Sequence, residues 1–305
     1  MSNLAKRVLT AVVAIPVILV ICNAGGIYFF AFVAIASAVA LYEFYRLTKA
    51  KGAQPLVALG ILSGFFVNLS FYRSRILSHL DSLLGDSAIP FPSQAQFLLI
   101  TLLVSVFAMG LVELFRNKGS AILNLSTTIF GVLYISLFFG TFIGIRELFT
   151  PMDFPMLQYN QTSVEEVYQW GGYTVISVLA VIWICDTAAF HVGKAWGKHK
   201  LFPRVSPNKS WEGAVFGFLF AVTSAVAAKY AVLGYMPLGS AVVIGIIVGV
   251  VGQLGDLVES LIKRDANVKD SSSLIPGHGG AFDRFDSLLL VSPLVYLYLD
   301  FVLFA

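Results

Sequence analysis

The sequence predicts an all-α, polytopic integral membrane protein with about nine transmembrane helices. Of its 305 residues, 58% are hydrophobic and only 12% are charged, whereas a soluble domain carries about 25% charged residues. The mean hydropathy is +0.84. A chain this poor in charge cannot cover a water-exposed surface, so most of its surface must face lipid.

Nine apolar stretches are long enough for a helix that crosses a bilayer, which takes about 20 residues. They are residues 8–24, 27–45, 55–72, 96–115, 121–145, 172–193, 212–231, 238–262 and 285–304. The first stretch follows a basic N-terminus and resembles a signal peptide. We interpret it as a membrane helix, because Ile21 stands where a small residue is expected and apolar sequence resumes after Gly26.

The distribution of basic residues predicts a cytoplasmic N-terminus and an outside C-terminus. With nine helices, the segments on the side of the N-terminus hold 16 of the 20 Lys and Arg residues. The other side keeps only Arg73, Arg75, Arg146 and Lys229. Such an excess of positive charge on one side is the pattern of cytoplasmic loops.

Two segments on the outer side carry no motif of chemical interest. Residues 74–85 place five leucine and isoleucine side chains on one helical face, which predicts a helix lying on the outer membrane interface. Residues 150–171 are expected to form an irregular, acidic loop.

The polar residues divide the chain into an N-terminal transmembrane bundle, residues 1–171, and a C-terminal catalytic region, residues 172–305. In the second part, four glycines at 245, 249, 252 and 255 lie along the eighth predicted helix. Small residues at this spacing favour close packing against a neighbouring helix.

Ionisable residues inside membrane helices cost about 2.5–3.5 kcal/mol each near the bilayer centre. The sequence places Asp186 in the sixth predicted helix, and Asp256 and Glu259 in the eighth. Both carboxylates of the eighth helix share one face with Ser260 and Lys263. Two interpretations stay open, a salt-bridge ladder at a helix end and a functional site.

The segment that leads into the ninth helix is the most polar part of the chain. It holds Lys263, Arg264, Lys269, Asp270, Gly277, His278, Gly279, Gly280, Asp283, Arg284 and Asp286. Asp283 and Asp286 project from one side of a first helical turn, and carboxylates placed opposite Asp256 suit a hard cation such as Mg²⁺. Glycines before a helix also expose N–H groups to phosphate, although turns use glycine for geometry alone.

A second polar cluster precedes the seventh helix. It contains lysines at 194, 198 and 200, followed by Ser206, Lys209, Ser210 and Glu212. The lysines can serve as anchors at the inner leaflet, with Ser210 as a helix N-cap and Glu212 favoured by the helix dipole. A substrate site is the alternative, because neither role requires Lys209 beside Glu212.

Several chemistries are excluded. The sequence has no P-loop, no G-x-S-x-G turn and no H-E-x-x-H motif. Cys22 and Cys185 lie in apolar runs, which argues against a disulfide framework and a structural zinc site. A reaction whose nucleophile is already ionised would need none of these parts.

Four different short motifs follow one another in the last third of the chain. They are Ser260-Leu261-Ile262-Lys263-Arg264, Lys269-Asp270, His278-Gly279-Gly280 and Asp283-Arg284-Phe285-Asp286. Together with the block from Asp186 to Gly213, they resemble the signature of the CDP-diacylglycerol synthases (phosphatidate cytidylyltransferases). The resemblance covers residues 184–305 closely. It departs at Asn208, where the family usually has a lysine, and at Ala281, where a larger aliphatic residue is usual.

This resemblance implies the reaction of CTP with phosphatidic acid to give CDP-diacylglycerol and pyrophosphate, dependent on Mg²⁺ and open to a second cation. It implies metal binding by Asp256 and Asp283, with Asp286, Glu259 and Asp186 as further ligands. It also implies catalytic roles for Lys263, Lys209 and Arg284 beside these carboxylates. The implied substrate-binding residues are Ser206, Lys209, Glu212, Lys263, Arg264, Lys269, Asp270, His278, Gly279 and Gly280.

The expected partners are CTP, phosphatidic acid and membrane lipids, without nucleic acid, and small-residue helix faces are compatible with a homodimer. The expected location is a bacterial-type inner membrane with the active site on the cytoplasmic side. Two other functions use similar residues: a CTP-dependent lipid kinase, which would release CDP, and a cation-coupled transporter. The clustering of carboxylates toward one membrane face favours the synthase over a transporter.

Overall fold

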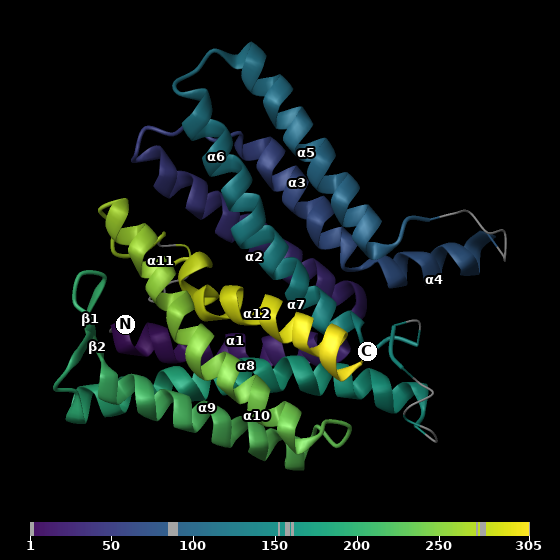
Figure 1. The fold of residues 1–305 in the computed structure, drawn as a ribbon, viewed down its shortest axis with the longest axis vertical. Coiled ribbons are helices and arrows are strands. Elements are labelled where there is room, and N and C mark those ends of the chain that lie inside the picture. Colours follow the sequence, from purple (N-terminus) through teal and green to yellow (C-terminus); the bar gives the residue numbers. More distant parts are fainter. Residues whose placement is uncertain are drawn as a thin grey trace.

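The computed structural model describes residues 3–84, 91–151, 153–155, 159, 162–272, 274 and 279–304, with side chains from residue 12 onward except at 81, 83 and 84. The fold is almost entirely helical (Figure 1). This confirms the prediction of an all-α polytopic membrane protein.

The first half of the chain forms seven helices. They are α1 (Asn3–Ala24), α2 (Gly26–Lys49), α3 (Val57–Ser70), α4 (Arg73–Leu84), α5 (Gln94–Arg116), α6 (Ala121–Gly131) and α7 (Leu137–Glu147). A π-helical turn, Val132–Ser136, joins α6 to α7. Ser93 and Gln96 form a capping box at the start of α5, which satisfies two backbone N–H groups.

The second half begins with α8 (Val164–Trp196), the longest helix, and a short antiparallel hairpin. The hairpin strands are β1 (Lys200–Phe202) and β2 (Ser206–Ser210), with Lys200 opposite Ser210. The remaining elements are α9 (Trp211–Ala231), α10 (Leu238–Ile247), a π-helical turn (Val248–Gly252), α11 (Gln253–Asp265), a 3-10 turn (Phe282–Arg284), α12 (Asp286–Tyr298) and a final π-helical turn (Leu299–Leu303).

The predicted count of nine transmembrane helices is not supported. Within the described residues, seven helices are long and apolar enough to cross a membrane, or eight if the pair α3–α4, bent by 70°, is one span. All nine predicted stretches do form helix. However, α3 has only 14 residues, which at about 1.5 Å each falls short of a bilayer about 30 Å thick. The described apolar part of α1, Val12–Ala24, is also short. The orientation of the termini stays a prediction.

One predicted boundary differs from the structure. The segment 150–171 is not wholly irregular, because α8 begins at Val164, where the Ser163 side chain accepts a hydrogen bond from the Glu166 N–H. The division predicted between residues 171 and 172 therefore lies within one continuous helix. By contrast, the predicted helix over 74–85 is confirmed as α4.

Glycines bring the C-terminal helices into close contact, as their spacing predicted. A Cβ atom on Gly245 would lie 2.6 Å from the Val222 Cα of α9, and one on Gly255 would lie 2.6 Å from the Asp286 carbonyl oxygen. Gly255 therefore allows α11 to approach the first turn of α12. This contact places Asp256 of α11 near Asp286 of α12.

A buried arginine joins α1 to α7 and α8 at the end of the bundle opposite the hairpin. The Arg146 side chain is fully buried, and its guanidinium donates to the carbonyl oxygens of Cys22 (3.3 Å) and Asn23 (3.4 Å). The same group lies 4.1 Å from the centre of the Tyr168 ring. Arg146 thus binds the carbonyl end of α1, where a cation is favourable, and is not an exposed loop cation.

Candidate active site

A polar cavity of about 500 Å³ lies between α8, the hairpin, α9 and α11. Its charged lining residues are Asp186, Lys194, Lys200, Lys209 and Asp256. Because these residues come from two predicted membrane helices and from the polar cluster before the seventh helix, the fold unites segments up to 70 residues apart in one site. Small residues such as Gly193, Gly197 and Gly213 form much of the remaining wall.

Lys209 and Asp256 form an ion pair in this cavity. The Lys209 Nζ lies 2.8 Å from Asp256 Oδ2, and both side chains are partly exposed to the cavity, at 24% and 34%. Strand β2 is extended, which directs Lys209 toward α11, where its Nζ also donates to the Gln253 carbonyl at 3.4 Å. Ser260 donates to Asp256 Oδ1 at 3.3 Å, one helical turn away. The predicted shared face of residues 256 and 260 is confirmed by this contact.

Asp186 and Asp256 line this cavity together with Lys209. Asp186 belongs to α8, Asp256 to α11, and Asp286 is the first residue of α12. A Cβ atom on Gly255 would lie 2.6 Å from the Asp286 carbonyl oxygen, so Asp286 is close to the turn of α11 that carries Asp256. These carboxylates supply the oxygen atoms that a hard cation prefers.

The hairpin is held to α9 by Glu212. Its carboxylate accepts hydrogen bonds from the His199 N–H at 3.2 Å and lies 2.7 Å from the His199 ring Nδ1. Ser210 accepts from the Gly213 N–H at 3.2 Å, which confirms the N-cap interpretation for this residue. A substrate role for Glu212 stays a prediction.

A second acidic group surrounds Lys263. The Lys263 Nζ lies 2.7 Å from Glu259 Oε2 and 2.8 Å from Asp283 Oδ1. The Glu259 side chain is fully buried, and the side chains of Lys263 and Asp283 are 12% and 4% exposed. The ion pair between Glu259 and Lys263, four residues apart, confirms that they share one face of α11. The pair is buried and includes Asp283, so it differs from a salt-bridge ladder at an exposed helix end.

Asp283 holds both ends of the loop between α11 and α12. Its carboxylate accepts hydrogen bonds from the Ser271 N–H (3.0 Å), the Ser271 hydroxyl (2.9 Å) and the Gly280 N–H (2.7 Å). Burial opposes the ionisation of Asp283, but its interactions with the neighbouring Glu259–Lys263 pair and the hydrogen bond from the Gly280 N–H outweigh burial and lower the pKa of Asp283 to about 2. The carboxylate is therefore ionised at neutral pH. Any metal at Asp283 would compete with these donors.

Glu43 of α2 is a site residue that the sequence analysis missed. It is only 2% exposed. Its carboxylate accepts from the hydroxyls of Ser271 (3.1 Å) and Ser272 (2.5 Å). It also accepts from the N–H groups of Ala281 (3.2 Å) and Phe282 (2.8 Å). A carboxylate inside the apolar second helix was a usable signal, because such a residue is costly in a membrane.

The chain is similar to several proteins named phosphatidate cytidylyltransferase. The chain is 33% identical over 299 residues to a phosphatidate cytidylyltransferase of Bacillus subtilis, with 98% of each chain covered. It is 30% identical to one of Synechocystis sp., covering 98% of this chain and 97% of the relative, and 31% identical to one of Staphylococcus aureus, covering 96% and 98%. The model of the cytidylyltransferase family matches residues 5–302.

The chain belongs to the cytidylyltransferase family. This membership confirms the resemblance drawn from the C-terminal motifs and extends it, because the match includes the N-terminal half. The match over the N-terminal half agrees with the structure, because Glu43 of α2 accepts hydrogen bonds from Ala281 and Phe282 in the loop between α11 and α12.

Several residues that were predicted to bind substrate or to take part in catalysis do not line the cavity. Arg264, Lys269, Asp270 and Arg284 are exposed, and Arg264 donates to the Val268 carbonyl at 3.2 Å. Ser206 pairs with Phe202 in the hairpin. A Cβ atom on Gly279, whose φ is +84°, would lie 2.6 Å from Asp283 Oδ2. Gly277 and His278 lie outside the described residues. The roles of all these residues stay predictions.

The described residues contain no group of three or more His, Cys, Asp or Glu side chains already arranged to hold a metal ion. The five predicted metal ligands divide into two groups instead. Asp186 and Asp256 line the cavity with Lys209, and Asp286 lies next to Gly255 of α11, while Glu259 and Asp283 form ion pairs with Lys263. Asn208, where the family usually has a lysine, lines the same cavity as Lys209.

Proposed function

We propose that this protein transfers the cytidylyl group of CTP to phosphatidic acid, giving CDP-diacylglycerol and pyrophosphate in phospholipid biosynthesis. The observation that carries the proposal is the cavity in which Asp186 and Asp256 face three lysines, in a chain that matches phosphatidate cytidylyltransferases over nearly its full length. The membrane helices and bacterial relatives support a bacterial inner membrane as its location. The cavity lies on the cytoplasmic side if the excess of Lys and Arg marks that side.

The reaction needs little acid–base chemistry from the protein. A phosphate monoester has a second pKa near 6, so the phosphatidate oxygen is ionised at neutral pH. That oxygen attacks the α-phosphorus of CTP, a new P–O bond forms, and the bond between the α-phosphorus and the bridging oxygen breaks. The electron pair leaves with pyrophosphate. Catalysis then consists of positioning and charge neutralisation.

The lysines of the cavity supply the positive charge for this step. Lys194, Lys200 and Lys209 line one cavity, so a triphosphate bound there would meet three ammonium groups. The exposed cations Arg264, Lys269 and Arg284 lie on the loop side and would neutralise the phosphatidate headgroup. Lys263, which is buried between Glu259 and Asp283, would orient these carboxylates and not bind phosphate directly.

Mg²⁺ fits the first acidic group. Asp186 and Asp256 line the cavity, and with Asp286 beside α11 they offer hard oxygen atoms to a cation. Mg²⁺ is usually bound by one or two carboxylates together with substrate phosphates and water, so a preformed cage is not needed. When bound, the ion would stabilise the charge that develops on pyrophosphate. Lys209 would then move from Asp256 to a phosphate oxygen.

The test is an assay of the purified protein in detergent with phosphatidic acid, α-labelled CTP and Mg²⁺, with and without chelator. We expect label to enter the lipid with equal release of pyrophosphate, and we expect the chelator to stop it. Release of CDP with a phosphorylated lipid would instead establish a CTP-dependent lipid kinase. A preparation that consumes no nucleotide would contradict both and favour a transporter.

Replacing Lys229 is expected to have little effect on turnover. It lies in the last turn of α9, at the end away from the hairpin, with its Nζ 4.4 Å from the centre of the Tyr230 ring. Lys229→Ala should change turnover by less than about twofold, because Lys229 does not line the candidate active-site cavity and a partly exposed charge contributes little. Steady-state rates measured with both substrates check this. A total loss would overturn the placement of the site.

A further inference from the structure

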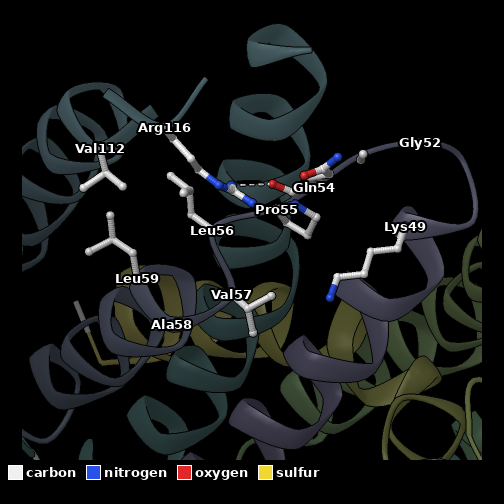
Figure 2. Close-up of a pocket in the computed structure, with 11 residues that line it drawn as sticks. Lys49, Gly52, Gln54, Pro55, Leu56, Val57, Ala58, Leu59, Val112 and Arg116 are labelled. Carbon is white, nitrogen blue, oxygen red and sulfur yellow. Dashed lines mark hydrogen bonds between the residues drawn. The ribbon is translucent and has the colours of Figure 1, made fainter. Parts of the chain in front are cut away.

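A second cavity, of about 740 Å³, lies outside the candidate active site (Figure 2). It is formed by the end of α2, the segment that leads into α3, and the last turns of α5. Lys49 and Arg116 supply its two cationic side chains, while Leu59 and Val112 belong to an apolar wall. The cavity therefore combines positive charge with an apolar surface.

The walls of this cavity are held by hydrogen bonds. The Gln54 N–H donates to Asn124 Oδ1 at 2.6 Å, and the Leu56 N–H donates to Thr128 Oγ1 at 3.0 Å. Arg116 Nη1 donates to the Gln54 carbonyl at 2.6 Å, the dashed line in Figure 2. These bonds join the α2–α3 segment to α5 and α6. The cavity is thus a defined feature of the fold.

A mostly apolar groove, lined mainly by α2 and α3, adjoins this cavity. The groove has a volume of about 550 Å³, and Ala58 lines both it and the cationic cavity. Further along, its walls include Ala34 and Ala38 of α2 and Ile61, Leu62 and Phe65 of α3. The groove runs beside most of α3, so it offers an apolar channel whose cationic mouth is at one end.

The cationic mouth lies at the same end of the bundle as the start of the loop between α11 and α12. Lys51, two residues after Lys49, forms an ion pair of 3.0 Å with Asp265, the last residue of α11. Lys49 is exposed and forms no ion pair within the described part of the chain. Arg116 shares its charge with Glu113 at 3.4 Å, so the mouth keeps a net positive charge.

We propose that this groove binds an anionic phospholipid, with its phosphate between Lys49 and Arg116 and one acyl chain along α3. The charge of the mouth complements a phosphate, and the groove complements an acyl chain. Anionic headgroups and basic side chains also meet at one depth, the membrane surface. This lipid is distinct from the one that reacts, because the cavity around Lys209 shares no lining residue with this groove.

The test is native mass spectrometry of the full-length protein, delipidated in detergent and titrated with phosphatidylglycerol or with zwitterionic phosphatidylethanolamine. Lys49→Ala and Arg116→Ala should each weaken phosphatidylglycerol binding about fivefold, the contribution of one basic side chain near the surface. Phosphatidylethanolamine binding should change much less. Lys118→Ala is the matched control, since Lys118 is close in the sequence but lines neither cavity.

A second variant tests the groove without altering charge. Ala58 is exposed and lines both cavities, so Ala58→Phe fills the junction without disturbing the buried core. We expect it to lower binding of phosphatidylglycerol by a similar factor. Unchanged binding in Lys49→Ala, Arg116→Ala and Ala58→Phe, each folded, would overturn the proposal. So would equal loss in the Lys118→Ala control.

Discussion

Replacing Asp256 with Asn is expected to lower turnover roughly 10²–10³-fold, the scale seen when one preorganised electrostatic group is removed from a site. Asn has nearly the same volume and retains an oxygen that can accept from Ser260 and Lys209. It lacks the negative charge, which is the property that a bound cation and the orientation of Lys209 require. Asp256 is 34% exposed and forms only two side-chain contacts of this kind, so folding should be preserved.

The matched control for this variant is Asp265→Asn on the same helix. Asp265 is 68% exposed and pairs with Lys51 at the surface, and exposed ion pairs contribute only about 0–1 kcal/mol to stability. Its turnover should stay within about twofold of the unmodified protein. Rates of label transfer into lipid, measured on protein of verified elution profile, distinguish the two. If Asp256→Asn retained full turnover, Asp256 would have no role in the reaction.

Replacing Glu43 with Ala should lower turnover by roughly 30-fold or more, although Glu43 belongs to α2 and does not line the cavity. The change leaves the Ser272 hydroxyl and the N–H groups of Ala281 and Phe282 without their acceptor, and it removes one of the two acceptors of the Ser271 hydroxyl. Each buried donor left unpaired costs about 1–3 kcal/mol. The loop that carries Asp283 would then lose its fixed position.

Two measurements separate this positioning role from a general loss of stability. Glu43→Gln keeps the volume and one acceptor oxygen, so it should recover part of kcat relative to Glu43→Ala at a temperature at which both are folded. Amide exchange should increase in the loop between α11 and α12 and stay unchanged in α9 and α10. Glu165→Ala, at an exposed position in the first turn of α8, is the control. Normal kcat in Glu43→Ala would contradict the assignment.

The secondary structure was predictable because its signals are local. Apolar stretches, the Ser93 and Ser210 caps and the i,i+4 pairs of α11 depend on residues within a few positions of one another. The errors have equally local causes. A 14-residue helix such as α3 has the hydropathy of a span without the length, and Ser163 starts α8 earlier than hydropathy alone indicates.

Apart from Glu43, the charged residues of the candidate site were also found from the sequence, because charges inside apolar helices are costly and stand out. The way in which these residues group in space was not predicted. The sequence analysis placed Asp256 opposite Asp283, whereas the structure pairs Asp256 with Lys209 and pairs Asp283 with Lys263 and the loop. Helix spacing predicts which residues share a face, but not which neighbouring helix that face meets.

The sequence by itself therefore determined the membrane class, the family and the list of ionisable residues that a polar site requires. Only the tertiary structure decided how these residues divide into two groups and which distant residue holds the loop. Glu43 and Ala281 are 238 positions apart, and no local pattern relates them. Their contact depends on how α2 packs against the C-terminal helices, where buried N–H groups need an acceptor.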